Sequence, residues 1–153
     1  METKPEGPDP QRSRVMSRIR GSNTKPEILI RKMLHARGFR FRLHRKDLPG
    51  RPDIVLPRYN AVIFVNGCFW HGHNCHLFRS PKTREDFWHE KLNTNIERDR
   101  RNIALLRQSG WRVYIVWECA VRNSTQKDIQ SLSDDIKEWL LSESTAGESH
   151  GKD

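Results

Sequence analysis

The apolar positions of this chain follow a helical spacing in three ranges. A helix is expected between Thr24 and Gly38, because Thr24 can cap its N-terminus and Pro26 suits its first turn. Longer helical patterns cover residues 83–109 and 127–141. The side chains expected to face inward from the first of these are Phe87, Leu92, Ile96, Ile103 and Leu106.

Four other segments have the spacing or composition of strands. Residues 39–43 alternate apolar and basic side chains, with Arg40, Arg42 and His44 on the expected outer face. Residues 53–56 and 61–65 are rich in β-branched residues, and residues 111–117 alternate again. A strand–helix–strand order implies a right-handed crossover and parallel pairing of the last strand. We therefore predict an α/β fold with one mixed sheet and helices on both faces.

The length and composition favour one highly charged domain. Its 153 residues suit a single core over residues 12–142, between tails at 1–11 and 143–153 that we expect to be disordered. Lys and Arg number 28 against 19 Asp and Glu, a net charge of +9, which favours a polyanionic partner such as DNA. No apolar run approaches the roughly 20 residues of a membrane span, and no signal-peptide core is visible. We expect a cytoplasmic protein.

The cysteines indicate a metal site, because their odd number argues against a disulfide framework. Cys68, His73 and Cys75 have the spacing C-x4-H-x-C, and Cys119 directly follows a predicted core strand. Three thiolates and one imidazole would complete a tetrahedral structural zinc site. Spacing alone leaves His71 as an alternative to His73. Cys68 and Cys119 also fit a second interpretation, as small buried hydrophobic residues.

A carboxylate at the start of a strand indicates a second metal site. Asp53 follows Arg51-Pro52 at the mouth of the predicted sheet, where Mg²⁺ could be held by its oxygens and a nearby backbone carbonyl. His71 is then available as a general acid or base near neutral pH, unless it is only a solvated loop histidine. Glu27 is either a helix cap or a residue facing the same edge.

Large aromatic side chains stand beside this chemistry. Phe69 and Trp70 lie in the predicted loop 67–82, and Trp88 opens the long helix. Such residues beside a basic surface can wedge between base pairs and unstack them. The other three tryptophans fit core positions.

Four motifs together resemble the very short patch repair (Vsr-type) DNA mismatch endonucleases over roughly residues 12–142. The resemblance implies a restriction-endonuclease-like fold. It also implies nicking of one strand 5′ of the thymine in a T·G mismatch, as left by deamination of 5-methylcytosine. The motifs are LPGRPD at 48–53, VIF..GCFWH.H.C at 62–75, FW.EK...N.ERDRR at 87–101 and GWRV.IVWEC at 110–119.

The resemblance also implies roles for particular residues. Asp53 would hold Mg²⁺ together with the main-chain carbonyl of Val65, His71 would be the general acid/base, and Glu27 a supporting acidic residue. His73 rather than His71 would join the three cysteines on zinc. DNA would be contacted by intercalating Phe69, Trp70 and Trp88 and, near the mismatched pair, by Met16, Lys91 and Asn95.

One departure affects the catalytic set. Asn66 stands where family members can carry a second histidine, and an amide can bind a phosphate or water but cannot exchange a proton. Acid/base duty would then fall on His71 alone.

Two other functions compete with the nicking enzyme. One is a restriction-type enzyme that cuts both strands, and the other is a zinc-stabilised DNA-binding module, which has no use for Asp53 and His71. No self-complementary dimer face is evident, so we expect a monomer. A cytosine-5 DNA methyltransferase system and repair proteins are candidate partners.

Overall fold

A computed structural model describes residues 24–68, 71, 84–122 and 125–151. Five strands form one sheet in the order β1-β2-β3-β4-β5. Strand β2 is antiparallel to its neighbours β1 and β3, whereas β3, β4 and β5 run parallel. This is the predicted mixed sheet. Its strands are β1 (Arg42–Leu43), β2 (Ile54–Leu56), β3 (Ala61–Asn66), β4 (Arg112–Trp117) and β5 (Ala146–Ser149).

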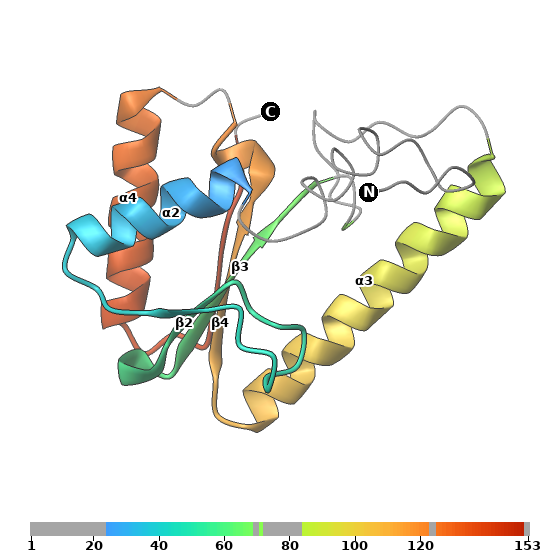
Figure 1. Ribbon diagram of the computed structural model, residues 1–153, viewed down its shortest axis with the longest axis horizontal. Coiled ribbons are helices and arrows are strands. Elements are labelled where there is room, and N and C mark those ends of the chain that lie inside the picture. The colour runs from blue at the N-terminus through green and yellow to red at the C-terminus, as the bar shows by residue number, and fades with distance from the viewer. Residues whose placement is uncertain (1–23, 69–70, 72–83, 123–124, 152–153) are drawn as a thin grey trace, which may run out of the picture.

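Helices cover both faces of this sheet, as the sequence predicts (Figure 1). Helix α2 (Lys25–Ala36) and helix α4 (Gln126–Leu141) pack on one face, and the long helix α3 (Glu85–Gln108) lies on the other. Helix α3 connects β3 to β4, and α4 connects β4 to β5, so each parallel pair is joined through a helix. Among the described helices, none combines the length and apolar character needed to cross a membrane.

The alternation of side chains along the strands divides the core into two layers. Ile63 and Tyr114 belong to the layer that α2 and α4 cover, whereas their neighbours Val62 and Val113 pack with Leu106 of α3. Successive side chains of a strand point to opposite faces, so a strand covered on both faces is apolar throughout. This explains the continuous apolar run of β3.

Arg112 joins the start of β4 to the end of α4. Its guanidinium lies 4.5 Å from the centre of the Trp139 ring. The side chain also donates to five backbone carbonyl oxygens, including those that the last turn of a helix leaves without intrahelical partners. The acceptors are Tyr59 (3.1 Å), Trp139 (2.6 Å), Leu140 (3.2 Å), Ser142 (2.9 Å) and Ser144 (2.8 Å).

Two expectations, one about the strand over residues 39–43 and one about Phe87, need correction. The strand expected over 39–43 is confined to the two residues of β1, because Phe39 turns into the core and packs edge-on against Tyr59. Phe87, expected to face inward, is 45% exposed, because it lies in the first turn of α3, where Arg84 stacks over its ring. Leu92 and Leu106 are buried as expected.

The expectation of a disordered tail over 143–153 is wrong for residues 146–149. They form β5, which pairs in parallel with β4 over four residues. Gly147 lies so close to the rings of Tyr114 and Trp139 that a Cβ atom there would clash with both. The segment pairs with β4 through backbone hydrogen bonds, and its small residues fit close to the neighbouring rings. It therefore lacks the apolar alternation by which a strand is recognised in a sequence.

Candidate active site

Asp53 is a half-buried carboxylate directly before β2. Its Oδ2 accepts a hydrogen bond of 2.7 Å from the backbone N–H of Val65 in β3. Burial, which disfavours the charged form, is the main reason that the pKa of Asp53 rises from 3.8 to about 6. The Val65 hydrogen bond lowers this pKa, the Glu27 charge raises it, and the His44 and His71 charges lower it. Several charged groups therefore act on one carboxylate.

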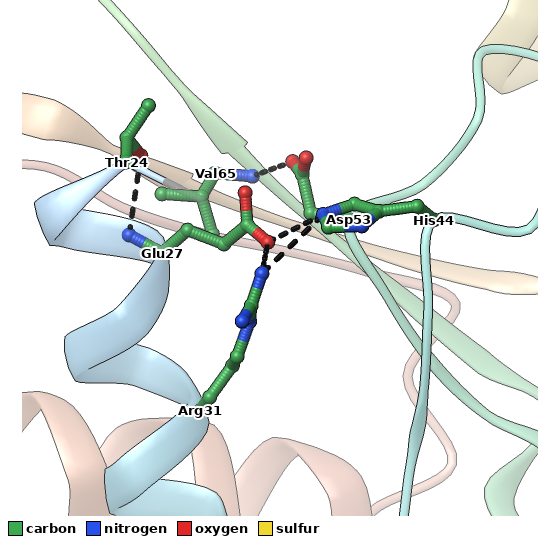
Figure 2. Close-up of polar contacts among 6 residues, drawn as sticks. All are labelled: Thr24, Glu27, Arg31, His44, Asp53 and Val65. Atoms are coloured by element: carbon green, nitrogen blue, oxygen red, sulfur yellow. Dashed lines mark hydrogen bonds and ion pairs between the residues drawn. The ribbon is translucent and has the colours of Figure 1, made fainter. Parts of the chain in front are cut away.

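Glu27 lies in the first turn of α2 and is only 1% exposed. Its backbone N–H donates to the Thr24 hydroxyl over 3.4 Å, so Thr24 caps the helix as predicted. The Glu27 side chain points away from the cap, and its Oε2 contacts Arg31 and lies 2.6 Å from Nε2 of His44 (Figure 2). Of the two interpretations left open for Glu27, the structure therefore places it at the same edge as Asp53.

His44 joins these two carboxylates, which the sequence pattern did not indicate. Ligand atoms of Glu27, His44 and Asp53 all lie within 4.8 Å of one another. The His44 backbone N–H donates to the Asp53 carbonyl over 3.2 Å, one residue beyond the register pair Leu43–Ile54. The register of β1 on β2, which pairs Leu43 with Ile54, is what brings residue 44 opposite residue 53, and no pattern within one segment indicates it.

A second pair of groups lies at the carboxyl end of β3. Nδ1 of His71 contacts Oδ2 of Asp99, which α3 carries. The His71 ring also packs edge-on to Trp117, with centroids 6.3 Å apart. Asp99 was also missed, although it lies inside the motif FW.EK...N.ERDRR.

The structure describes half of the predicted zinc set. Cys68 and Cys119 are both buried and belong to one cluster with Trp117, although 50 residues separate them in sequence. His73 and Cys75 lie outside the described residues, as do Phe69, Trp70 and Met16. Asn66 is the last residue of β3 and is buried there.

The three predicted DNA contacts on α3 lie along one stripe of the helix. Trp88, Lys91 and Asn95 are spaced by three and four residues, and four further residues lead to Asp99. Trp88 packs edge-on against Phe87, with ring centroids 5.4 Å apart. Asn95 is buried and its Oδ1 accepts from Arg98 over 3.0 Å. The stripe therefore runs from the half-buried Trp88 at the helix start to Asp99, the partner of His71.

Comparison with known proteins fits this arrangement. A sequence model of the family described as DNA mismatch endonuclease Vsr matches residues 8–77. The Escherichia coli DNA mismatch endonuclease Vsr is 44% identical over 137 residues, which cover 90% of this chain and 88% of that protein. The chain belongs to the Vsr family. It is therefore a DNA endonuclease, as predicted, and its substrate is DNA.

Other members of the Vsr family carry a second kind of name. The Type II nicking enzyme V.XorIIP of Xanthomonas oryzae is 53% identical over 111 residues, covering 72% of this chain and 82% of that protein. The Type II nicking enzyme V.NmeAIP of Neisseria meningitidis is 48% identical over 113 residues, covering 74% and 81%. These two matches span about four fifths of each relative's length.

Proposed function

We propose that this Vsr-family endonuclease nicks one strand of duplex DNA on the 5′ side of the thymine in a T·G mismatch, with Mg²⁺ at Asp53. The observation that carries this proposal is the convergence of Asp53 with Glu27 and His44 at the same sheet edge, together with the His71–Asp99 pair after β3. Mismatch cleavage and nicking are what the names of its relatives describe.

The residues around Asp53 fit a divalent cation. Two carboxylates converge there, a buried Glu27 and a half-buried Asp53, and their mutual repulsion is costly unless a cation offsets it. The Val65 amide contacts Asp53, so the Val65 carbonyl, the second proposed ligand, belongs to the same end of β3. When bound, Mg²⁺ would polarise the phosphodiester and stabilise the leaving oxygen.

His71 is proposed to move the proton. Because Asp99 contacts Nδ1, the other ring nitrogen is left to face the substrate, and the carboxylate stabilises the imidazolium formed when Nε2 takes a proton from water. Asn66 is proposed to bind a phosphate oxygen or a water, since its amide cannot exchange a proton.

A structural zinc ion is proposed on Cys68, His73, Cys75 and Cys119. The two cysteines that the structure describes support it, because they are buried in one cluster despite their separation in sequence. Zinc on these four residues would tie the segment 67–82 to the end of β4.

DNA binding is proposed to involve the stripe on α3 together with the loop. Phe69, Trp70 and Trp88 would intercalate beside the mismatch, and Met16, Lys91 and Asn95 would approach the mismatched pair. The excess of basic residues supplies the general affinity for phosphates. The monomeric state, the cytoplasmic location and the link to a cytosine-5 methyltransferase system stay predictions.

The test is a strand-specific cleavage assay with Mg²⁺ on a duplex with a central T·G pair and on its T·A counterpart. The proposal expects a nick only in the thymine strand of the mismatched duplex, lost in Asp53→Ala. Asp47→Ala is the matched control, because Asp47 is 61% exposed and pairs with Arg45 in the loop before β2. Cleavage of both strands would favour the restriction-type enzyme. Binding without cleavage, equal in wild type and Asp53→Ala, would favour the binding module.

A further inference from the structure

His44 brings a nitrogen atom to a site whose proposed ligands are otherwise oxygens. Its Nε2 is 2.6 Å from Oε2 of Glu27, and the ligand atoms of Glu27, His44 and Asp53 lie within 4.8 Å of one another. Ions with ligand distances of about 2.1 Å place opposite ligands about 4.2 Å apart. Adjacent ligands lie about 3.0 Å apart, so side-chain shifts within the 4.8 Å span of this group would let one ion contact all three.

The backbone of His44 is held in an unusual conformation that serves this convergence. Its φ is +47°, in the left-handed region that few residues other than glycine adopt, although histidine is among the more tolerant. The hydrogen bond from its N–H to the Asp53 carbonyl fixes it there. Figure 2 shows the resulting direction of the ring, toward Glu27 and Asp53. Backbone strain of this kind is concentrated at functional sites.

The contacts of Nε2 show how an ion would enter. Nε2 lies 2.6 Å from Oε2 of Glu27 and 3.5 Å from Nη2 of Arg31, so a proton on Nε2 would be donated to the carboxylate. An ion between Nε2 and Oε2 would take the place of that proton, and the neutral imidazole would carry its proton on Nδ1. Arg31 contacts Glu27 on α2, one turn away, so the carboxylate keeps a partner for its remaining charge.

We propose that His44 is the third side-chain ligand of the divalent cation and that its imidazole makes the site bind Mn²⁺ more tightly than Mg²⁺. This inference rests on the proposed cation at Asp53. Mg²⁺ is usually held by oxygen ligands and water, whereas imidazole nitrogen favours transition-metal ions. A site of two carboxylates and one imidazole therefore discriminates between ions that an all-oxygen site would treat more equally.

The experiment measures binding of Mn²⁺ to the full chain, from the electron paramagnetic resonance signal of free Mn²⁺, and of Mg²⁺ by competition. His44→Gln removes the nitrogen and keeps a polar group beside Glu27, and Asp53→Ala removes the central carboxylate. His89→Gln is the matched control, since His89 is exposed on α3 beside Asp86 and Glu90. Circular dichroism establishes that each variant is folded.

Wild type is expected to hold one Mn²⁺ that Asp53→Ala does not, with at least about tenfold preference over Mg²⁺. His44→Gln should lose about tenfold in Mn²⁺ affinity and little in Mg²⁺ affinity, while His89→Gln matches wild type. Pulsed paramagnetic resonance should show ¹⁴N coupling to the bound Mn²⁺ in wild type and in His71→Gln. The ¹⁴N signal from those two proteins tests the ligand even if His44→Gln is unfolded.

The two ways of failing are distinct. An unchanged Mn²⁺ to Mg²⁺ ratio in His44→Gln, or no ¹⁴N coupling in wild type, would overturn the role of His44 while leaving the cation at Asp53. Equal Mn²⁺ binding by wild type and Asp53→Ala, or no binding by either, would instead remove the proposed metal site, and the inference with it.

Discussion

Replacing Asp53 by Asn is expected to stabilise the protein at neutral pH when no divalent cation is present. Wild type must keep a charged carboxylate in a half-buried position, and loss of solvent is the main cause of its raised pKa. Asparagine has nearly the same shape, and its Oδ1 can accept the 2.7 Å hydrogen bond that Val65 donates. The substitution therefore removes the charge and retains the contact.

The size of the effect follows from the pKa. A rise from 3.8 to about 6 corresponds to about 3 kcal/mol at neutral pH. Relaxation and residual solvent contact reduce this, so we expect about 1–2 kcal/mol. Folded Asp53 binds its proton more tightly than unfolded Asp53. Its contribution to stability is thus fully present below pH 3.8 and is lost as the pH rises through about 6.

Urea unfolding of wild type and Asp53→Asn, without divalent cations, measures this difference between about pH 3.5 and pH 7.5. The variant should be more stable at the upper end, and the two curves should converge at the lower end. Mg²⁺ should then stabilise wild type alone, by about 1.4 kcal/mol or more when its concentration exceeds the dissociation constant tenfold.

Asp47→Asn is the control for this series. Asp47 is exposed, and its hydrogen bond with Arg45 lowers its pKa, so its substitution should not stabilise the protein at neutral pH. If Asp53→Asn is the less stable protein at about pH 7.5 without cations, the argument from burial is refuted.

Four further predictions address other parts of the molecule. Arg112→Ala should lower the free energy of unfolding by about 3 kcal/mol, since five carbonyl oxygens lose a charged donor, and Arg112→Lys should recover part of it in urea titrations. Asp99→Asn should reduce the rate of single-turnover cleavage about 100-fold without weakening DNA binding; an unchanged rate would contradict the His71 pairing. Gly147→Ala should cost about 2 kcal/mol, because its methyl group clashes with Tyr114, and equal thermal stability would argue against β5. Elemental analysis should find one zinc per chain, reduced in Cys119→Ser; absence of zinc from active protein would refute the four-ligand set.

The sequence predicts those parts of the fold that bury apolar surface. Strands β3 and β4 are covered on both faces, so their residues are apolar enough to be recognised without any partner. Helix α2 is predictable for a local reason, since its cap and first turn are encoded in four consecutive residues. Strand β5 escapes prediction because Ala146–Ser149 contributes backbone and little apolar surface.

The residues of the candidate site also differ in whether the sequence alone indicates them. Asp53 is visible in the sequence, because a carboxylate at the start of an apolar strand is unusual. His44 is not, because its approach to Glu27 depends on the register between β1 and β2 and on a left-handed backbone angle. Asp99 reaches His71 across 28 residues, through the placement of α3 against the sheet. Such pairings are tertiary, so a pattern within one segment does not contain them.

Strand β5 also affects how the chain folds as it is made. Trp117 and Cys119 leave the ribosome before Glu148 and Gly151, which contact them through the Trp117 indole N–H and the Cys119 sulfur. At about 5–20 residues per second, the outer edge of β4 stays open for roughly 1.5–6 seconds. During this interval its unpaired backbone groups can accept a strand from a second nascent chain. The order of synthesis thus leaves β4 open to mispairing during translation until β5 has been made.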